Sequence, residues 1–404
     1  MLLHDATCRA CGPGLASRAP AKEGPMESTS EPHLSVRPIL PVHVVGIAAT
    51  EFVTEHDAML DELVFDVVYR ALREAGLRKQ DLGLSVSASM DVLDGRSISS
   101  GLTNAASGGY LSDAFRVEGD AGVAIVSAAE AIASGDVEVA VAVGVHNPET
   151  TGDAMRRGRF LEQVSNLAFD PHFDRPVGLT ANTAYGLHAA RVLAVSRMRA
   201  EGFAALAASE ISRSAGLDRS VRRRGATAQD VLDSVPVAWP LHELMLPAHS
   251  AGAVAVVLAS PARAGRCVGR DAKLTGLGHS TGGYTWTGEW LADPGAATRR
   301  ATRAALATSG ASARDVALAE VSAPTPHLHQ PLVDALGIDA NVTVNPSGGM
   351  RSNFPGLANG GLRLLEVVER IGELPSGSIA LSHSLDTITG GVAEDATVIA
   401  VEAA

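Results

Sequence analysis

Cysteine is scarce in this chain: its 404 residues include only Cys8, Cys11 and Cys267. So few thiols in a chain of this size exclude a disulfide framework, and we expect the reducing environment of the cytoplasm. Cys8 and Cys11 form a CxxC pair, which is half of a zinc-ribbon pattern. No second pair of cysteines or histidines follows at ligand spacing, so the sequence predicts no structural zinc there.

Long apolar runs and clusters of basic residues are also missing. No stretch approaches the roughly 20 apolar residues of a membrane-spanning helix, so we expect a soluble protein. The formal net charge of −12 argues against nucleic acid and anionic membranes as partners. Residues 1–37 are rich in Pro, Ser, Ala and Gly without the apolar core of a secretory signal, and we expect a disordered extension. Met26 is an alternative natural start.

What the chain does have is a large apolar content, 46% of its residues, arranged in strand and helix patterns. Short continuous apolar runs predict buried strands, and apolar residues at helical spacing predict helices. The predicted strands are 42–49, 84–89, 137–145, 254–258 and 274–277, and the predicted helices are 61–75, 122–134, 179–198 and 362–371.

The second half of the chain repeats features of the first. Five positions return at the same offsets: Ala71-Leu72, Gly76, Asp81 and Leu84 are echoed by Ala305-Leu306, Gly310, Asp315 and Leu318. Both copies predict a helix, a glycine cap, a short turn and a strand. The segment 122–145 likewise has a counterpart at 362–382. Two such halves predict a pseudo-duplicated α/β fold in which helices cover mixed sheets.

We expect the first half at 38–265 and the second at 266–404, with an inserted, lid-like loop subdomain at 150–235. The stretch NPSGGMRSNFPGLANGG, residues 345–361, precedes the helix at 362–371. Its prolines and paired glycines predict a long loop. A helix N-terminus offers N–H groups and a positive dipole to an anion or a polarised carbonyl. The alternative is a tight connection between two packed elements.

This loop resembles a signature of the thiolase superfamily, in which NPSGG precedes a GHPxGATG loop. Further phrases are similar to the lipid-transfer or sterol-carrier type of thiolase-like (acetyl-CoA acetyltransferase-like) protein: DGRSIS at 94–99, AAEAIASGDVEVAVAVGV at 128–145, RPVGLTANTAYGLHAAR at 175–191 and PLHELMLPAHSAGAVAVVLAS at 240–260. The resemblance implies α-β-α-β-α layers, a homodimer, and an acyl-CoA as substrate rather than cofactor. It also implies a hetero-oligomer with a small zinc-ribbon/OB-fold protein.

The positions that carry catalysis in that family are changed here. Its nucleophilic cysteine falls between Glu118 and Ala121, where no cysteine is present, so an acyl-cysteine intermediate is excluded. The other changed positions are Ala251-Gly252 for Asp-Gly, Ser322 for the oxyanion-hole Asn of NEAF, Asn353 or Phe354 for the His of GHPxGATG, and Ser382 for the second cysteine. Thiolysis is therefore not expected.

A thioester substrate could still be cleaved without a covalent step. A retro-aldol cleavage or a decarboxylation requires a base or an acid near the β-oxygen and an oxyanion hole for the enolate. Asp120 or Glu118, at the entrance of the buried helix, offers a carboxylate whose pKa would be raised by burial. The alternative is an acid that only caps the helix and complements its dipole.

Histidines supply further candidates. His383 follows the strand predicted at 379–381, and with Ser382 and Asp386 it could form an acid/base cluster. The alternative is a structural histidine at a strand end. His249 lies at another position that corresponds to the family's site.

Two other patterns are interpreted as structural. His327 and His329 lack a third ligand at recognisable spacing and are interpreted as a loop pair, so no metal site is expected. Tyr284 could donate to a substrate oxygen or pack under its loop, and packing is the favoured interpretation. GLGHSTGG, residues 276–283, does not complete GxGxxG, so no dinucleotide site is expected.

The loop at 345–361 is interpreted as a binding and positioning element that includes Asn345, Gly348 and Gly349. Asn353 could donate to a thioester oxygen, whereas Phe354 could only shape the pocket. We expect a protein that makes or breaks a carbon–carbon bond of an acyl thioester, by retro-aldol cleavage, decarboxylation or atypical acyl transfer. The alternatives are an inactive thiolase-fold subunit and an acyl- or lipid-binding protein that supports a partner.

Overall fold

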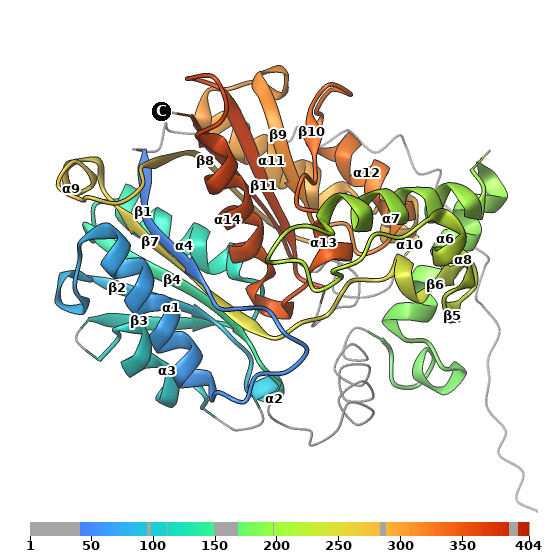
Figure 1. Cartoon of the computed structure of the whole chain (residues 1–404), viewed down its shortest axis with the longest axis horizontal. Coiled ribbons are helices and arrows are strands. Elements are labelled where there is room, and N and C mark those ends of the chain that lie inside the picture. Colours follow the sequence, from blue (N-terminus) through green and yellow to red (C-terminus); the bar gives the residue numbers. More distant parts are fainter. Residues whose placement is uncertain are drawn as a thin grey trace, which may run out of the picture. The chain divides into compact units, whose positions relative to one another are not determined.

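The computed structural model describes residues 41–94, 98–110, 112–148, 169–196, 198–282, 288–387 and 395–403, coloured along the chain in Figure 1. The extension 1–37 with its CxxC pair, the first part of the inserted segment and Tyr284 lie outside these residues. Among the described helices, none is both long enough and apolar enough to cross a membrane.

A mixed sheet of ten strands organises the described chain, in the order β10-β9-β11-β12-β8-β1-β7-β4-β2-β3. β1 and β8 pair antiparallel in the middle of this order, and so join two halves of five strands each. The strands are β1 (Val42–Ala49), β2 (Leu84–Ala88), β3 (Asp113–Val117), β4 (Val139–His146), β7 (Gly252–Ala259), β8 (Ala272–Thr281), β9 (Val316–Val321), β10 (Thr343–Val344), β11 (Ile379–Leu385) and β12 (Asp395–Glu402).

The two halves match strand for strand. From the outer edge inward, β3-β2-β4-β7-β1 corresponds to β10-β9-β11-β12-β8. In each half the three outer strands are parallel to one another. The fourth strand pairs antiparallel with the third, and the fifth pairs antiparallel with the fourth. Because topology and direction both repeat, the pseudo-duplicated α/β fold predicted from the sequence is confirmed.

Helices complete five layers. α1 (Leu60–Ala75) covers the outer face of the first half, and α11 (Ala296–Ser309) covers the outer face of the second. α4 (Ala121–Ala133) and α14 (Asn359–Ile371) lie between the two halves, where their apolar residues pack against strands of both (Figure 1). α14 is buried on nearly all sides, including Arg363 and Glu366. The molecular centre is therefore a pair of buried helices.

The predicted echo has the same local structure in both halves. α1 ends at Gly76 with φ 71°, and α11 ends at Gly310 with φ 70°. Glycine is favoured there because the left-handed region is open to it without a Cβ clash. A 3-10 turn then leads into the next strand, through Lys79–Asp81 in the first half and Ala313–Asp315 in the second.

The inserted segment packs on the second half, although it interrupts the first in sequence. Its described part comprises α6 (Ala181–Val195), α7 (Ala200–Ser214) and α8 (Ala228–Asp233), and the hairpin β5 (Pro236–Ala238)–β6 (Leu241–His242) follows it. α7 contacts α12 (Pro326–Leu336) and α13 (Gly349–Ser352), as Figure 1 shows. The remaining helices are α2 (Asp91–Asp94), α3 (Ser100–Ser107), α9 (Pro261–Ala264) and α10 (Gly288–Ala292).

Three local predictions were wrong. The strand predicted at 379–381 continues to Leu385, because β12 pairs with it along its whole length, so His383 lies inside β11. The segment 345–361 is not all loop, since it contains α13 and a 3-10 turn at Gly356–Ala358. His327 and His329 lie in α12 rather than in a loop.

Candidate active site

The N-termini of α4 and α14 meet at one buried carboxylate. Asp120 is 2% exposed and caps α4: its Oδ1 accepts from the N–H of Gly122 at 2.8 Å. Its Oδ2 accepts from the N–H of Gly360, in the first turn of α14, at 2.9 Å. One carboxylate thus receives donors from the positive ends of two helices, one from each half.

The two helices approach so closely that only glycine fits. A Cβ on Gly360 would overlap Asp120 and the nitrogen of Gly122, and would lie 2.8 Å from the Cα of Gly122. A Cβ on Gly122 would overlap the hydroxyls of Ser384 and Thr397. Gly122 and Gly360 are therefore required for this contact, and they bring the two N-termini to the same point.

Two hydroxyls extend the polar site. The Ser384 hydroxyl of β11 donates to Asp120 Oδ1 at 2.6 Å, and lies 2.6 Å from the Thr397 hydroxyl of β12. Because Ser384 uses its proton on Asp120, the hydroxyl of Thr397 is the donor in the second bond. Sequence reasoning missed both hydroxyls. The alternation of side chains along β11 would have placed Ser384 on the same face as Ser382.

Burial controls the charge of Asp120. Removal from water raises the pKa of Asp120 to about 7, although its bonds from Ser384, Gly122 and Gly360 act in the opposite direction. The neighbouring charge of Asp386, just after β11, raises that pKa further. Asp386 is 2% exposed, and its Oδ2 lies 3.4 Å from where a Cβ on Gly119 would be. The site therefore holds two buried carboxyl groups, one of which titrates near neutrality.

Ser322 lies on the other side of the α14 N-terminus. Its hydroxyl accepts from the side-chain amide of Asn359 at 2.8 Å, and Asn359 precedes the Gly360 that binds Asp120. The acceptor role leaves the Ser322 proton available to another acceptor. Asn359 Oδ1 is buried without a hydrogen-bond partner in the described chain. Ser322 and Asp120 thus flank the dipeptide Asn359-Gly360.

His383 contacts the backbone of Ser322, but its two ring nitrogens are bonded to Ser322 and Thr298 and not to Asp120. Its Nδ1 accepts from the Ser322 N–H at 3.2 Å, so Nε2 carries the proton and donates to the Thr298 hydroxyl of α11 at 3.1 Å. Burial lowers the pKa of His383 to about 3, so the ring is neutral. Ser382 points to the opposite face of β11, because adjacent strand residues alternate. The structure therefore does not bring His383 and Ser382 together as one cluster.

The NPSGG part of the loop is held beneath α7. Asn345 accepts from the Val321 N–H at 2.6 Å and donates to Glu210 at 3.0 Å. A Cβ on Gly348 would lie 2.6 Å from the carbonyl oxygen of Glu210, and one on Gly349 would lie 2.6 Å from Asn345 Nδ2. Asn345, Gly348 and Gly349 therefore make contacts that position the loop.

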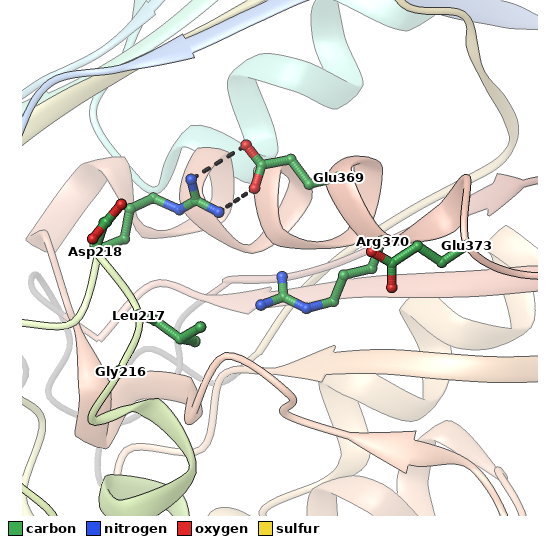
Figure 2. Close-up of a pocket in the computed structure, with 7 residues that line it drawn as sticks. Gly216, Leu217, Asp218, Glu369, Arg370 and Glu373 are labelled. Atoms are coloured by element: carbon green, nitrogen blue, oxygen red, sulfur yellow. Dashed lines mark hydrogen bonds and ion pairs between the residues drawn. The ribbon is translucent and has the colours of Figure 1, made fainter.

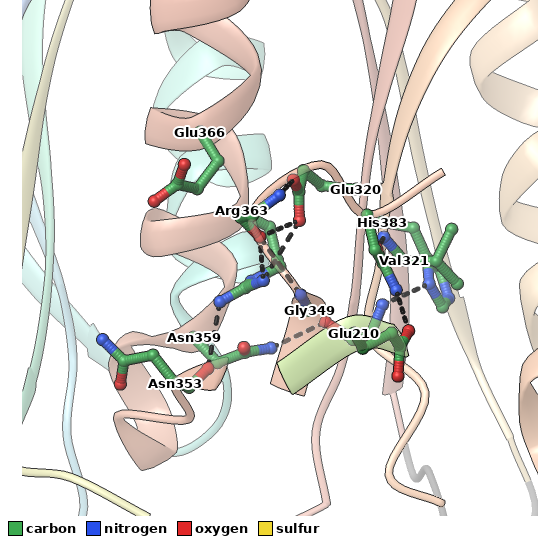
Figure 3. A network of polar contacts seen from close by, with 12 residues as sticks. Glu210, Glu320, Val321, Gly349, Asn353, Asn359, Arg363, Glu366 and His383 are labelled. Carbon is green, nitrogen blue, oxygen red and sulfur yellow. Dashed lines mark hydrogen bonds and ion pairs between the residues drawn. The ribbon is translucent and has the colours of Figure 1, made fainter. Parts of the chain in front are cut away.

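Two buried ion pairs fix the same region (Figure 3). Arg351 pairs with Glu210 of α7, and Arg363 of α14 pairs with Glu320 of β9 at 3.1 Å. All four side chains are at most 1% exposed. Because a lone buried charge is strongly unfavourable, each pair ties its two elements together. The inserted segment is thereby attached to the loop that leads into α14.

The remaining predicted residues differ in their surroundings. Asn353 uses its amide internally: its Nδ2 donates to the Arg219 carbonyl and its Oδ1 accepts from Ser250, both at 2.6 Å. Phe354 is 2% exposed and packs in an apolar cluster, with the exposed His249 ring 5.1 Å away. Glu118 is exposed and binds Arg116 at 2.7 Å, so it does not enter the buried helix contact.

An open cleft of about 410 Å³ lies beside the second part of α14 (Figure 2). Arg219 and Arg370 in this cleft are paired with carboxylates, namely Glu366 and Glu369. Asp218 and Glu373 add further negative charge. This acidic lining does not suit the phosphates of CoA. No group of three potential metal ligands occurs among the described residues.

Comparison with known proteins gives one relative and one solved structure of note. No protein-family model matches the chain. It is 29% identical over 230 residues to the 17-hydroxy-3-oxo-4-pregnene-20-carboxyl-CoA lyase of Mycobacterium tuberculosis (strain ATCC 25618 / H37Rv), which covers 55% of this chain and 58% of the relative. The matched region thus spans little more than half of that curated relative.

The solved structure is described as an Ltp2-ChsH2(DUF35) aldolase. It superposes with a TM-score of 0.73 at 21% identity, and the match covers 90% of this chain and 98% of that chain. At this identity the likeness concerns the fold. Together with the duplicated halves and the five layers, it shows that this chain has a thiolase-like α/β fold.

Proposed function

We propose that the protein cleaves a carbon–carbon bond of a β-hydroxyacyl-CoA by a retro-aldol reaction. The observation that carries this proposal is the buried Asp120, which lies where two helix N-termini meet and has a pKa of about 7. An acid/base group that titrates near the working pH, beside positive helix ends, suits a reaction through an enolate. The relative named as a CoA-thioester lyase supports the same reaction class.

The proposed step begins at the β-hydroxyl. Ionised Asp120 removes the hydroxyl proton, the Cα–Cβ bond breaks, and its electron pair moves to the thioester carbonyl as an enolate. The β-carbon leaves as a ketone or an aldehyde, and the protonated carboxyl returns its proton to Cα. Burial keeps the pKa of Asp120 high, with a further contribution from the charge of Asp386, and Ser384 orients the carboxylate. Ser322, whose hydroxyl accepts from Asn359 and donates no hydrogen bond within the described residues, is the proposed donor to the enolate oxygen.

The test uses the compound in the relative's name, 17-hydroxy-3-oxo-4-pregnene-20-carboxyl-CoA. Incubation with the protein should release the 17-ketone and a shortened acyl-CoA, both detected by mass spectrometry. Asp120→Asn should reduce kcat at least a hundredfold, because general acid–base catalysis contributes about 10²–10⁴-fold. Undiminished turnover by Asp120→Asn would remove Asp120 from this role.

The partner proposal follows from the neighbour's name, which joins Ltp2 and a DUF35 component in one aldolase. We propose that this chain forms a homodimer and works with a small protein of that kind. The incubation is therefore run with and without such a protein. Absence of cleavage in both arms favours the second candidate, an acyl-binding subunit in which Asp120 only caps α4 and α14, a role its three hydrogen bonds already fill.

A further inference from the structure

A second group of buried polar atoms lies beyond the proposed acid/base site. Tyr185 of α6 is 5% exposed, and its hydroxyl has no hydrogen-bond partner in the described chain. His188, one turn later and 4% exposed, likewise has no hydrogen-bond partner at Nδ1 within the described chain. His327 of α12 is 2% exposed, and it lacks a partner at Nε2. Native proteins satisfy most buried polar atoms, so three such atoms in one place require an explanation.

Ring contacts show that these residues form one cluster. The His188 and His327 rings have their centroids 5.1 Å apart. Trp290 of α10 lies 4.8 Å from the His188 ring and 6.3 Å from the Tyr185 ring. Trp290 is only partly buried, so the cluster reaches the protein surface at that side chain. A flat, largely apolar group could contact these rings and meet the unpartnered atoms with an oxygen.

The charge of Asp386 links the cluster electrostatically to the proposed acid/base site. Burial raises the pKa of the Tyr185 hydroxyl, and the charge of Asp386 raises it further. The same Asp386 charge raises the pKa of Asp120, so one carboxylate acts electrostatically on both groups. Tyr185 therefore keeps its proton and remains a donor across the ordinary pH range.

Charge favours a neutral ligand here. Burial lowers the pKa of both His188 and His327, so both rings are neutral, although a hydrogen bond with the Leu291 backbone acts in the opposite direction on His188. A neutral ring that donates its one N–H to a backbone carbonyl presents its other nitrogen as an acceptor, so Nδ1 of His188 suits a hydroxyl. His327 Nδ1 is already engaged with the Thr325 hydroxyl at 3.0 Å, which leaves Nε2 for a ligand. The nearby Asp386 carboxylate repels an anion.

We propose that Tyr185, His188 and His327, beside Trp290, form a specificity subsite for a neutral oxygen of the acyl group, either a carbonyl or a hydroxyl. This inference rests on the proposed function, because it takes the acyl thioester as the ligand. The oxygen could be the β-hydroxyl itself or a more distant group. A site built to hydrogen-bond an oxygen discriminates against the analogue that lacks it, because its buried polar atoms then stay unpaired.

Binding is measured separately from turnover, in the Asp120→Asn chain, by calorimetric titration. Three thioesters are compared: 17-hydroxy-3-oxo-4-pregnene-20-carboxyl-CoA, its 3-deoxo analogue and its 17-deoxy analogue. We expect one analogue to bind at least tenfold more weakly, the effect of about one hydrogen bond. The analogue that loses affinity identifies which oxygen occupies the subsite.

Tyr185→Phe and His188→Phe are each added to the Asp120→Asn variant. Each should reduce the difference in affinity between the thioester and its weaker-binding analogue, because each keeps a ring and removes a polar atom. Thermal melting by circular dichroism checks the fold, and Tyr185→Phe should not lower Tm, since its hydroxyl has no hydrogen-bond partner among the described residues. The matched control is Ser87→Ala, which removes a buried unpartnered hydroxyl from β2 and should keep the difference.

The outcomes separate the two proposals. Discrimination without turnover by the wild-type chain supports the subsite and counts against the lyase reaction. Equal binding of all three thioesters, or no binding of any, overturns the subsite. The subsite is also overturned if the difference in affinity between the thioester and its analogue is as large in the Tyr185→Phe and His188→Phe variants as in the Ser87→Ala control.

Discussion

Asp120 Oδ2 accepts a hydrogen bond from the Gly360 N–H at 2.9 Å, across 240 residues of sequence. This contact joins the N-terminus of α4, the buried helix of the first half, to the N-terminus of α14, the buried helix of the second half. In a duplicated fold the two buried helices are related by the repeat, so their N-termini are brought to a common point. A carboxylate there is stabilised by both helix ends and destabilised by burial, and these opposed effects leave its pKa near neutrality.

Asp120→Asn should change how stability depends on pH. The pKa of Asp120 in the folded protein, about 7, exceeds its ordinary value of 3.8, so the folded state holds the proton more tightly. This contribution to stability is fully present below pH 3.8 and is lost as the pH rises through 7. The asparagine side chain does not titrate in this pH range, so the variant lacks this contribution.

The free energy of unfolding of the wild type minus that of Asp120→Asn should therefore fall between pH 4 and pH 8, by a value on the order of 4 kcal/mol. Urea denaturation of both proteins across this range measures the difference. Other titrating groups, including His383, are common to both proteins and cancel. Parallel stability curves would show that Asp120 ionises normally.

Gly360→Ala should destabilise the protein through the helix contact. The added methyl overlaps Asp120 and the Gly122 backbone, and neither can move without breaking a helix cap. We expect a loss of about 3 kcal/mol in the free energy of unfolding. Gly372→Ala is the matched control at the other end of α14, where φ is −68° and no atom lies within 4 Å of the new Cβ. Its effect should stay within about 0.5 kcal/mol, and equal losses would contradict the contact.

Ser384→Ala should raise the pKa of Asp120, because the Ser384 hydroxyl bond stabilises the ionised carboxylate. If ionised Asp120 is the base, the acid limb of the kcat/KM profile moves to higher pH by about 0.5–1 unit, the worth of one hydrogen bond. Ser382→Ala, on the same strand and face, removes a hydroxyl that gives Asp120 no bond in the described structure. Its acid limb should stay in place, and a shared shift would point to a change in packing.

Arg351→Met should leave Glu210 charged and buried, at a cost of about 3–5 kcal/mol in the free energy of unfolding. Adding Glu210→Gln removes that charge and should recover part of the loss. Arg370→Met is the matched control, because its partner Glu366 keeps Arg219. We expect less than about 1 kcal/mol for this control, measured by urea denaturation. Equal losses for Arg351→Met and Arg370→Met would show that the buried pair is not special.

His383 shows where sequence reasoning ended. Its position near the end of the strand indicated a site residue, but in β11 it points away from Asp120 and both ring nitrogens are bonded within the protein. Ser384, one residue later, is the side chain that reaches the carboxylate. His383 and Ser384 are adjacent in β11, so their side chains point to opposite faces of the sheet. The sequence could not resolve this difference, because the predicted strand stopped before both residues.

The sequence by itself determined the fold of this protein, since apolar periodicity, glycine caps and the repeat between the halves are local patterns with local causes. It also determined that no cysteine occupies the expected nucleophile position, and that Asp120 begins a buried helix. Only the tertiary structure decided that Asp120 caps a second helix, that the inserted segment is tied to the NPSGG loop by a buried ion pair, and that Tyr185, His188 and His327 share a cluster. Each of these depends on residues far apart in the chain, which only the close packing of the folded protein brings together.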